Sequence, residues 1–237
     1  MALPIISVPE FEDIIPSTGQ PITFRPFLVK EEKILYMALE GNNTNDTINA
    51  VTKALQNCII SPVDIDVNKL ASFDVEYLFL KLRSKSVGEV IELKLSHKNV
   101  EGCNHIYETD IRIDDIVPPI PTNDKNIMID QHYGVRMKYP SINLAKSLKN
   151  GVTPTASDTF SIIAKSIELI YDDSNVYDDF TEQEMLEWVE SLSEGQFRKI
   201  TQFFDTLPKL SHTVEWVCPV CKQKDTVVIE GLQNFFM

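Results

Sequence analysis

The sequence predicts an α+β fold, in which helical N- and C-terminal parts pack together and carry a β-hairpin insert. Two observations lead to this prediction. Apolar residues recur at helical spacing in the first and last thirds of the chain, as in the stripe Val75, Leu78, Phe79 and Leu82. Around residues 90–113 they alternate with polar residues instead, which is the pattern of strands with one buried face.

The composition is that of an ordinary globular protein with an acidic surface. The chain has 237 residues, with 35 acidic against 22 basic side chains and a net charge of -13. Such a charge repels a polyanion, and no cluster of Lys and Arg offers a local nucleic-acid face. We find no apolar run that could span a bilayer and no basic flank of a signal peptide. We therefore expect an intracellular protein that binds no nucleic acid and has no stable membrane insertion.

The N-terminal part begins with a proline-rich stretch and continues with helices. Residues 1–20 contain three prolines between acidic residues and predict an extended arm. A short strand is expected at 21–27, where Pro26 marks an edge or an end. Amphipathic helices should follow over 29–39, 46–58 and 74–82.

The middle and C-terminal parts alternate between strands and helices. Thr181 with Glu184, and Ser193 with Gln196, have the spacing of capping boxes and mark two helix starts. The expected strands are 90–96, 106–113, 126–130 and 133–139, and the expected helices are 156–171, 181–192 and 193–207. The predicted organisation is an arm over 1–20, a helical body from 21–89 and 141–210, and a zinc-ribbon-like β-rich part from 90–140 and 211–237.

The name of that last part comes from the cysteines. Cys218 and Cys221 flank a tight turn at the C-x-x-C spacing of a zinc knuckle, which supplies only two of the four ligands that structural zinc needs. His97 and Cys103 lie at the matching place between strands 90–96 and 106–113. We predict one structural zinc ion on Cys218, Cys221, Cys103 and His97, with His105 as the competing fourth ligand.

Other readings of the cysteines are less favoured. A nucleic-acid-binding zinc ribbon is the main alternative, and the net charge argues against it. A dithiol redox enzyme would place its C-x-x-C at a helix N-terminus, whereas Cys218 and Cys221 lie between strands. Cys58 lies in an apolar segment and is expected to be a buried structural thiol. Because the chain contains no P-loop, G-x-S-x-G or H-E-x-x-H motif, we expect no catalytic residue.

Several segments, taken in order, carry a resemblance to a known family. They are Phe24–Lys33, Phe73–Arg83, Gly134–Pro140, Phe203–Leu210 running into Cys218–Cys221, and Gly231–Phe236. The ordered set resembles the baseplate hub subunit and hub-assembly proteins of T-even-type contractile-tailed phages. That family commonly has two C-x-x-C knuckles, and here the first is replaced by His97 and Cys103 with a longer loop.

The resemblance implies a small, non-enzymatic morphogenesis protein. Such a protein works in the host cytoplasm during assembly, as a chaperone-like factor, or remains in the virion tail baseplate as a minor component. Its partners would be other baseplate hub proteins. The C-terminal tail, which ends in Phe235, Phe236 and Met237, should pack either on the protein's own core or in a groove of a partner.

Overall fold

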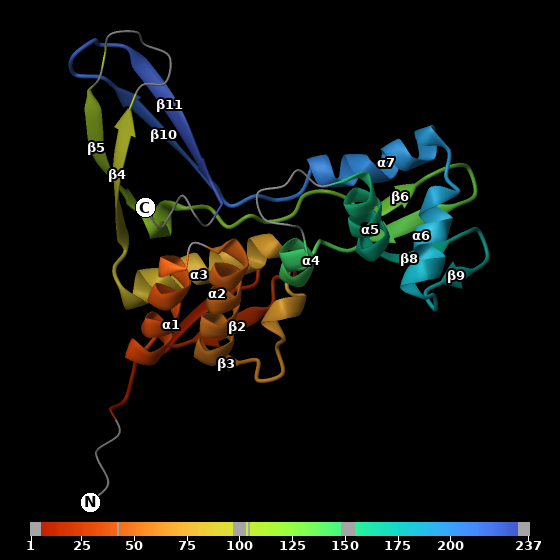
Figure 1. The fold of residues 1–237 in the computed structure, drawn as a ribbon, viewed down its shortest axis with the longest axis horizontal. Coiled ribbons are helices and arrows are strands. Elements are labelled where there is room, and N and C mark those ends of the chain that lie inside the picture. The colour runs from red at the N-terminus through yellow and green to blue at the C-terminus, as the bar shows by residue number, and fades with distance from the viewer. Residues whose placement is uncertain (1–5, 42, 97–102, 104, 148–154, 232–237) are drawn as a thin grey trace, which may run out of the picture.

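The structure, a computed structural model, describes residues 6–41, 43–96, 103, 105–147 and 155–231. It confirms the α+β class, since the described residues form helices and four small antiparallel sheets. These elements build two hydrophobic cores, which we call the first core and the second core. Figure 1 shows the elements of each core grouped at opposite ends of the molecule, with the two long hairpins projecting from the first.

The first core is built around one buried helix. Helix α3 contributes Phe79, Leu80 and Leu82, which are all almost fully buried. A sheet of order β1-β2-β3 and two further helices surround it. The elements are β1 (Phe11–Ile14), β2 (Pro21–Phe24), α1 (Val29–Glu40), α2 (Thr44–Cys58), β3 (Ile59–Ser61), η1 (Val67–Lys69) and α3 (Ser72–Ser86). The three helices expected from the sequence are thus present.

The prediction of an extended N-terminal arm over 1–20 is wrong for its second half, which packs on the first core. Strand β1 pairs with β2 in an antiparallel ladder, and Ile15 is only 1% exposed. The chain is held there from outside the sheet as well, because Asp74 accepts hydrogen bonds from the Ser17 amide at 2.8 Å and hydroxyl at 2.6 Å. Pro9 and Pro16 lie outside the short strand β1 that joins the core. Residues 1–5 lie outside the described residues.

Two hairpins extend from the first core. They consist of β4 (Val90–Ser96) with β5 (Ile106–Arg112), and β10 (Ser211–Val217) with β11 (Lys224–Glu230). The inward residues of each, such as Leu93 and Ile229, belong to the first core. The short helix η2 (Ile113–Asp115) follows β5. The alternating patterns over 90–96 and 106–113 therefore predicted β4 and β5, because one face of each is buried, and the runs on either side of Cys218 and Cys221 are strands as well.

The second core lies at the other end of the molecule. Its sheet has the order β6-β7-β8-β9, and helices α5, α6 and α7 supply many of its other apolar side chains. The capping boxes of Thr181 and Ser193 are confirmed at the starts of α6 and α7. The elements are β6 (Asn126–Met128), β7 (Gly134–Met137), α5 (Ala156–Ser166), β8 (Ile167–Tyr171), β9 (Val176–Tyr177), α6 (Glu182–Glu190) and α7 (Glu194–Asp205).

The expected packing of the N-terminal and C-terminal helices against each other is found only in part. The short helix α4 (Ile142–Ser147) contacts η1 and α3, and its Ile142 belongs to the first core. Helices α5, α6 and α7 belong to the second core instead, together with Met137 of β7 and Ile167 of β8. The buried apolar residues of these three helices thus pack with those strands and not with α1, α2 and α3.

The predicted helix 156–171 is also wrong in its last part. Helix α5 ends at Ser166 and the chain continues as β8, which pairs with β7. Ile167 and Ile170 are both buried, at a spacing that suits a helix. A register shift between Arg136 and Met137 of β7 allows both residues to face the core from a strand. Tertiary pairing therefore overrode the local periodicity.

Gly134 of β7 gives a test of this sheet. A Cβ atom placed there would overlap the ring of Tyr171, which is its register partner on β8. We expect Gly134→Ala to lower the free energy of unfolding by about 1–3 kcal/mol, since the ring must leave its position. Gly195→Ala in α7 is the matched control, because nothing lies within 4 Å of the added atom. Equal urea midpoints for the two variants would contradict this packing.

Candidate metal centre

Three cysteine thiols from the two hairpins meet at one point. Cys218 and Cys221 follow β10, and Cys103 precedes β5. Their sulfur atoms all lie within 4.8 Å of one another, and the Sγ atoms of Cys103 and Cys218 are 3.8 Å apart. Figure 1 shows the two hairpins running close together toward this end. Residues 115 positions apart in sequence are thereby brought into contact.

The turn between β10 and β11 presents two of these thiols on one side. The Cys218 amide donates to the Gln223 carbonyl at 2.9 Å, and the Lys222 amide donates to the Cys218 carbonyl at 3.0 Å. Lys222 has a φ of 60°, in the left-handed region that a non-glycine residue rarely adopts. The turn is therefore held in a specific conformation even at the cost of some backbone strain.

A stacked aromatic pair lies just behind the cysteines. The Trp216 ring of β10 stacks on the Tyr107 ring of β5, with centroids 5.0 Å apart and planes 11° apart. Trp216 is buried in the first core. The pair joins the two hairpins next to Cys218 and Cys103. We did not predict it from the sequence, although each aromatic residue lies within four residues of a cysteine.

The distances between the sulfurs fit a metal site. Zinc bound by thiolates has Zn–S bonds of about 2.3 Å, and a tetrahedron with such bonds places its sulfurs about 3.8 Å apart. The Cys103–Cys218 separation of 3.8 Å agrees with this value. It is far longer than the ~2.05 Å of a disulfide. Three soft thiolate donors favour zinc over magnesium or calcium.

The electrostatics of the cluster do not favour a redox enzyme. The Gln223 backbone N–H lowers the pKa of the Cys221 thiol, but burial and the thiols of Cys218 and Cys103 outweigh it, and the pKa is raised. A redox cysteine needs a lowered pKa, which gives it a thiolate at neutral pH. A bound cation would instead hold the thiols in their ionised form.

The remaining candidate ligands, His97 and His105, and the fourth cysteine, Cys58, lie outside the cysteine cluster or outside the described residues. His97 lies outside the described residues. His105 is described, but it is not part of the group of metal-ligating atoms found among the described residues. Cys58 is fully buried in the first core, as expected, and burial raises its pKa to about 11. It is therefore an unreactive structural thiol.

The surfaces of the hairpins carry charges of both signs. Lys94 of β4 pairs with Glu108 of β5 at 3.2 Å, and Lys224 of β11 pairs with Glu215 of β10 at 2.6 Å. Lys94 and Lys224 each have an acidic partner, which reduces the positive charge that these two lysines could offer to a nucleic acid. Among the described residues, no helix has the length and apolar character needed to cross a membrane.

Comparisons with known proteins place the chain in one family. The chain matches no curated protein and no solved structure closely enough to indicate a relationship. Residues 8–237, nearly the whole chain, match the family model described as T4 bacteriophage base plate protein. The match includes both cores and both hairpins. The chain therefore belongs to the T4 bacteriophage base plate protein family.

Proposed function

We propose that this chain is a non-enzymatic assembly factor or minor subunit of the baseplate hub, and that it acts through contacts with other hub proteins. The observation that carries the proposal is the family match over residues 8–237. The match spans both cores and both hairpins. The chain would act in the host cytoplasm during assembly and could remain in the tail baseplate of the virion.

Within this role, zinc would act as a structural element. We assign it to Cys103, Cys218, Cys221 and His97. The three thiols support this assignment by their mutual distances, and the chain between the two hairpins contains the entire second core. Because a preformed site does not exist in the unfolded chain, metal binding would contribute directly to the free energy of folding. A rigid pair of hairpins would then offer a fixed surface to a partner.

A nucleic-acid-binding zinc ribbon remains the second candidate, suggested by the knuckle alone. The net charge of -13 and the acidic partners of the hairpin lysines disfavour it. Fluorescence anisotropy with labelled duplex DNA separates the two functions. We expect no binding at physiological ionic strength. Affinity that falls steeply with rising salt would favour the nucleic-acid function instead.

The assembly role is tested by infecting cells with phage in which this gene carries an early stop codon. We expect incomplete baseplates that lack a finished hub, because a contact needed for hub assembly is missing. A plasmid that supplies the wild-type chain should restore complete baseplates, and an empty plasmid is the control. Complete baseplates in the absence of the chain, as judged by sedimentation and electron microscopy, would refute the proposed role.

A further inference from the structure

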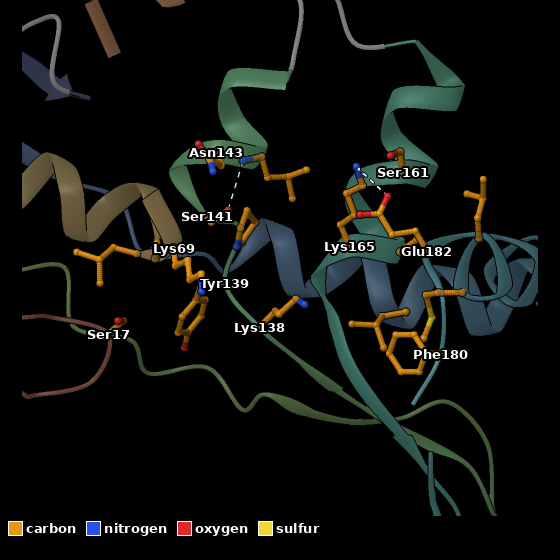
Figure 2. Close-up of a pocket in the computed structure, with 18 of the residues that line it drawn as sticks. Ser17, Lys69, Lys138, Tyr139, Ser141, Asn143, Ser161, Lys165, Phe180 and Glu182 are labelled. Carbon is orange, nitrogen blue, oxygen red and sulfur yellow. Dashed lines mark hydrogen bonds and ion pairs between the residues drawn. The ribbon is translucent and has the colours of Figure 1, made fainter. Parts of the chain in front are cut away.

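A groove of about 880 Å³ lies between the two cores. One side comes from the turn between β1 and β2 and from the junction of η1 with α3, and the other from helices α5 and α6. The segment 138–144 forms its middle. Figure 2 shows the lining side chains. None of these residues belongs to the cysteine cluster.

The middle of the groove is well anchored to both cores. The Tyr139 ring packs edge-on against the Phe73 ring, with ring centroids 5.2 Å apart, and stacks on the Phe203 ring, with centroids 5.7 Å apart. Phe73 is buried next to the first core, and Phe203 belongs to the second core. Backbone hydrogen bonds also tie the segment to the first core. The Ser72 amide donates to the Pro140 carbonyl at 3.2 Å, and the Ile142 amide donates to the Leu70 carbonyl at 3.0 Å. The middle of the groove is therefore held in place by contacts with both cores.

The lining of the groove has a charge opposite to that of the chain. It includes three lysines, Lys69, Lys138 and Lys165, and one acidic residue, Glu182. Lys165 pairs with Glu182 at 3.3 Å. Lys69 and Lys138 are exposed, and no ion pair to a described carboxylate is found for either. The groove is thus locally basic on a protein of net charge -13.

The lysines are spread along the groove and separated by apolar surface. Figure 2 places Lys69 toward one end and Lys165 toward the other, with Lys138 between them. Tyr139 lies near Lys69 and Lys138, and Phe180 lies at the other end, below Glu182 in the view. A single small anion would need donors that converge on one point. A row of separated charges on an apolar floor instead suits an extended chain that presents both acidic and apolar side chains along its length.

We propose that this groove binds an extended acidic segment of another protein, with carboxylates paired to Lys69 and Lys138 and apolar side chains against Tyr139 and Phe180. Charge complementarity with a chain that is otherwise acidic selects such a partner. The inference deepens the proposed assembly role and rests on it, since it names the chemistry of one contact through which a hub protein would be recognised.

The test is a titration of the purified full-length chain with a labelled synthetic peptide. The peptide has about ten residues in which Glu-Glu pairs alternate with Leu-Leu pairs, so that each face of the extended chain carries both kinds of side chain, and it spans about 33 Å. A peptide with Gln in place of Glu is the matched control. We expect the Glu peptide to bind at least about tenfold more tightly, with an affinity that falls as salt is raised.

Variants of the chain localise the binding. Lys69→Gln combined with Lys138→Gln should weaken binding of the Glu peptide about tenfold, which corresponds to two screened ion pairs. Lys53→Gln, an exposed residue of α2 outside the groove, should leave it unchanged. Circular dichroism verifies that each variant is folded.

Three results would overturn the inference. They are equal affinity for the Glu and Gln peptides, unchanged binding by the double variant, and displacement of the peptide by millimolar inorganic phosphate, which would indicate a small-anion site. The titration contains no other baseplate protein. If the peptide does not bind as expected, the proposed role of the groove is refuted, but the proposed assembly role is not affected. The infection experiment tests that role separately.

Discussion

Replacement of Cys218 by serine should cause the largest loss of stability of any single cysteine substitution in this chain. Cys218 is fully buried and its sulfur is 3.8 Å from that of Cys103, across 115 positions of sequence. A cross-link that closes a loop of ~100 residues contributes about 4–5 kcal/mol in the chain-entropy model. Loss of the metal should remove a contribution of that order. At ~2–4 °C per kcal/mol for a chain of this size, the melting temperature should fall by about 10 °C or more.

Two controls separate metal loss from general damage to the core. Cys58→Ser removes a buried thiol from the same core but outside the cluster, so this variant should keep its zinc and remain sensitive to a chelator. A chelator should lower the melting temperature of the wild-type chain toward that of Cys218→Ser, and should leave Cys218→Ser itself unchanged. A wild-type melting temperature that does not respond to the chelator would argue against a structural metal.

A second large effect is expected from the ion pair of Arg25 and Glu31. The Glu31 side chain is fully buried, and Arg25 Nη2 lies 3.2 Å from its Oε1. The Leu28 amide donates to the other carboxylate oxygen at 2.9 Å. Because Arg25→Met leaves this carboxylate without its main buried partner, we expect a loss of about 3–5 kcal/mol in the free energy of unfolding.

Lys30→Met is the matched control for that variant. Lys30 Nζ also approaches Glu31, at 3.5 Å, but its side chain is 67% exposed. An exposed partner contributes at most about 1 kcal/mol, so this variant should be nearly as stable as the wild type. Urea unfolding of both variants measures the difference. Similar losses for Arg25→Met and Lys30→Met would show that burial of the pair does not matter.

The same pair makes a prediction for acid pH. Burial raises the pKa of the Glu31 carboxyl, but the Arg25 guanidinium and the Leu28 amide outweigh it and bring the pKa below its ordinary value of 4.5. A lowered folded-state pKa means that the stabilisation is complete above the unfolded pKa and disappears as the pH falls through the folded pKa. Glu31→Gln should therefore lose less stability than the wild type between about pH 6 and about pH 3. Parallel pH profiles would contradict this assignment.

The features that the sequence predicted well depend on local order. The hairpin of β4 and β5 follows from alternation along 90–96 and 106–113. The structure groups the sulfurs of Cys103, Cys218 and Cys221 as the matching hairpin ends suggested, and the zinc ion and His97 as its fourth ligand stay predictions. The capping boxes of Thr181 and Ser193 are local as well. For the hairpin strands and the capping boxes, the residues that decide the structure lie within a few positions of one another, whereas Cys103 and Cys218 are 115 positions apart.

The features that could not be predicted depend on which surfaces meet. The apolar stripe of α5 could cover the N-terminal helices or its own strands, and nothing in its spacing distinguishes the two. In the sequence, Arg25 and Glu31 resemble ordinary exposed charges, and only the fold shows that the Glu31 carboxylate is buried. The groove combines Lys69, Lys138 and Lys165 from three separate elements. Two of the segments that carry the resemblance contain residues with a structural role. Arg25 and Glu31, the buried ion pair, lie in Phe24–Lys33, and Gly134, which lies against the Tyr171 ring, begins Gly134–Pro140.

The most direct measurement is native mass spectrometry of the purified full-length chain, alongside Cys103→Ser. In the proposed centre both hairpins contribute ligands to one ion, so the wild-type chain should carry a single zinc ion, and Cys103→Ser should lose it although its C-x-x-C turn is intact. X-ray absorption at the zinc edge should then show three sulfurs at about 2.3 Å and one nitrogen at about 2.0 Å, the nitrogen assigned to His97 by its loss in His97→Ala. A folded wild-type chain without zinc, or one whose zinc content is unchanged in Cys103→Ser, would contradict a metal shared between the two hairpins.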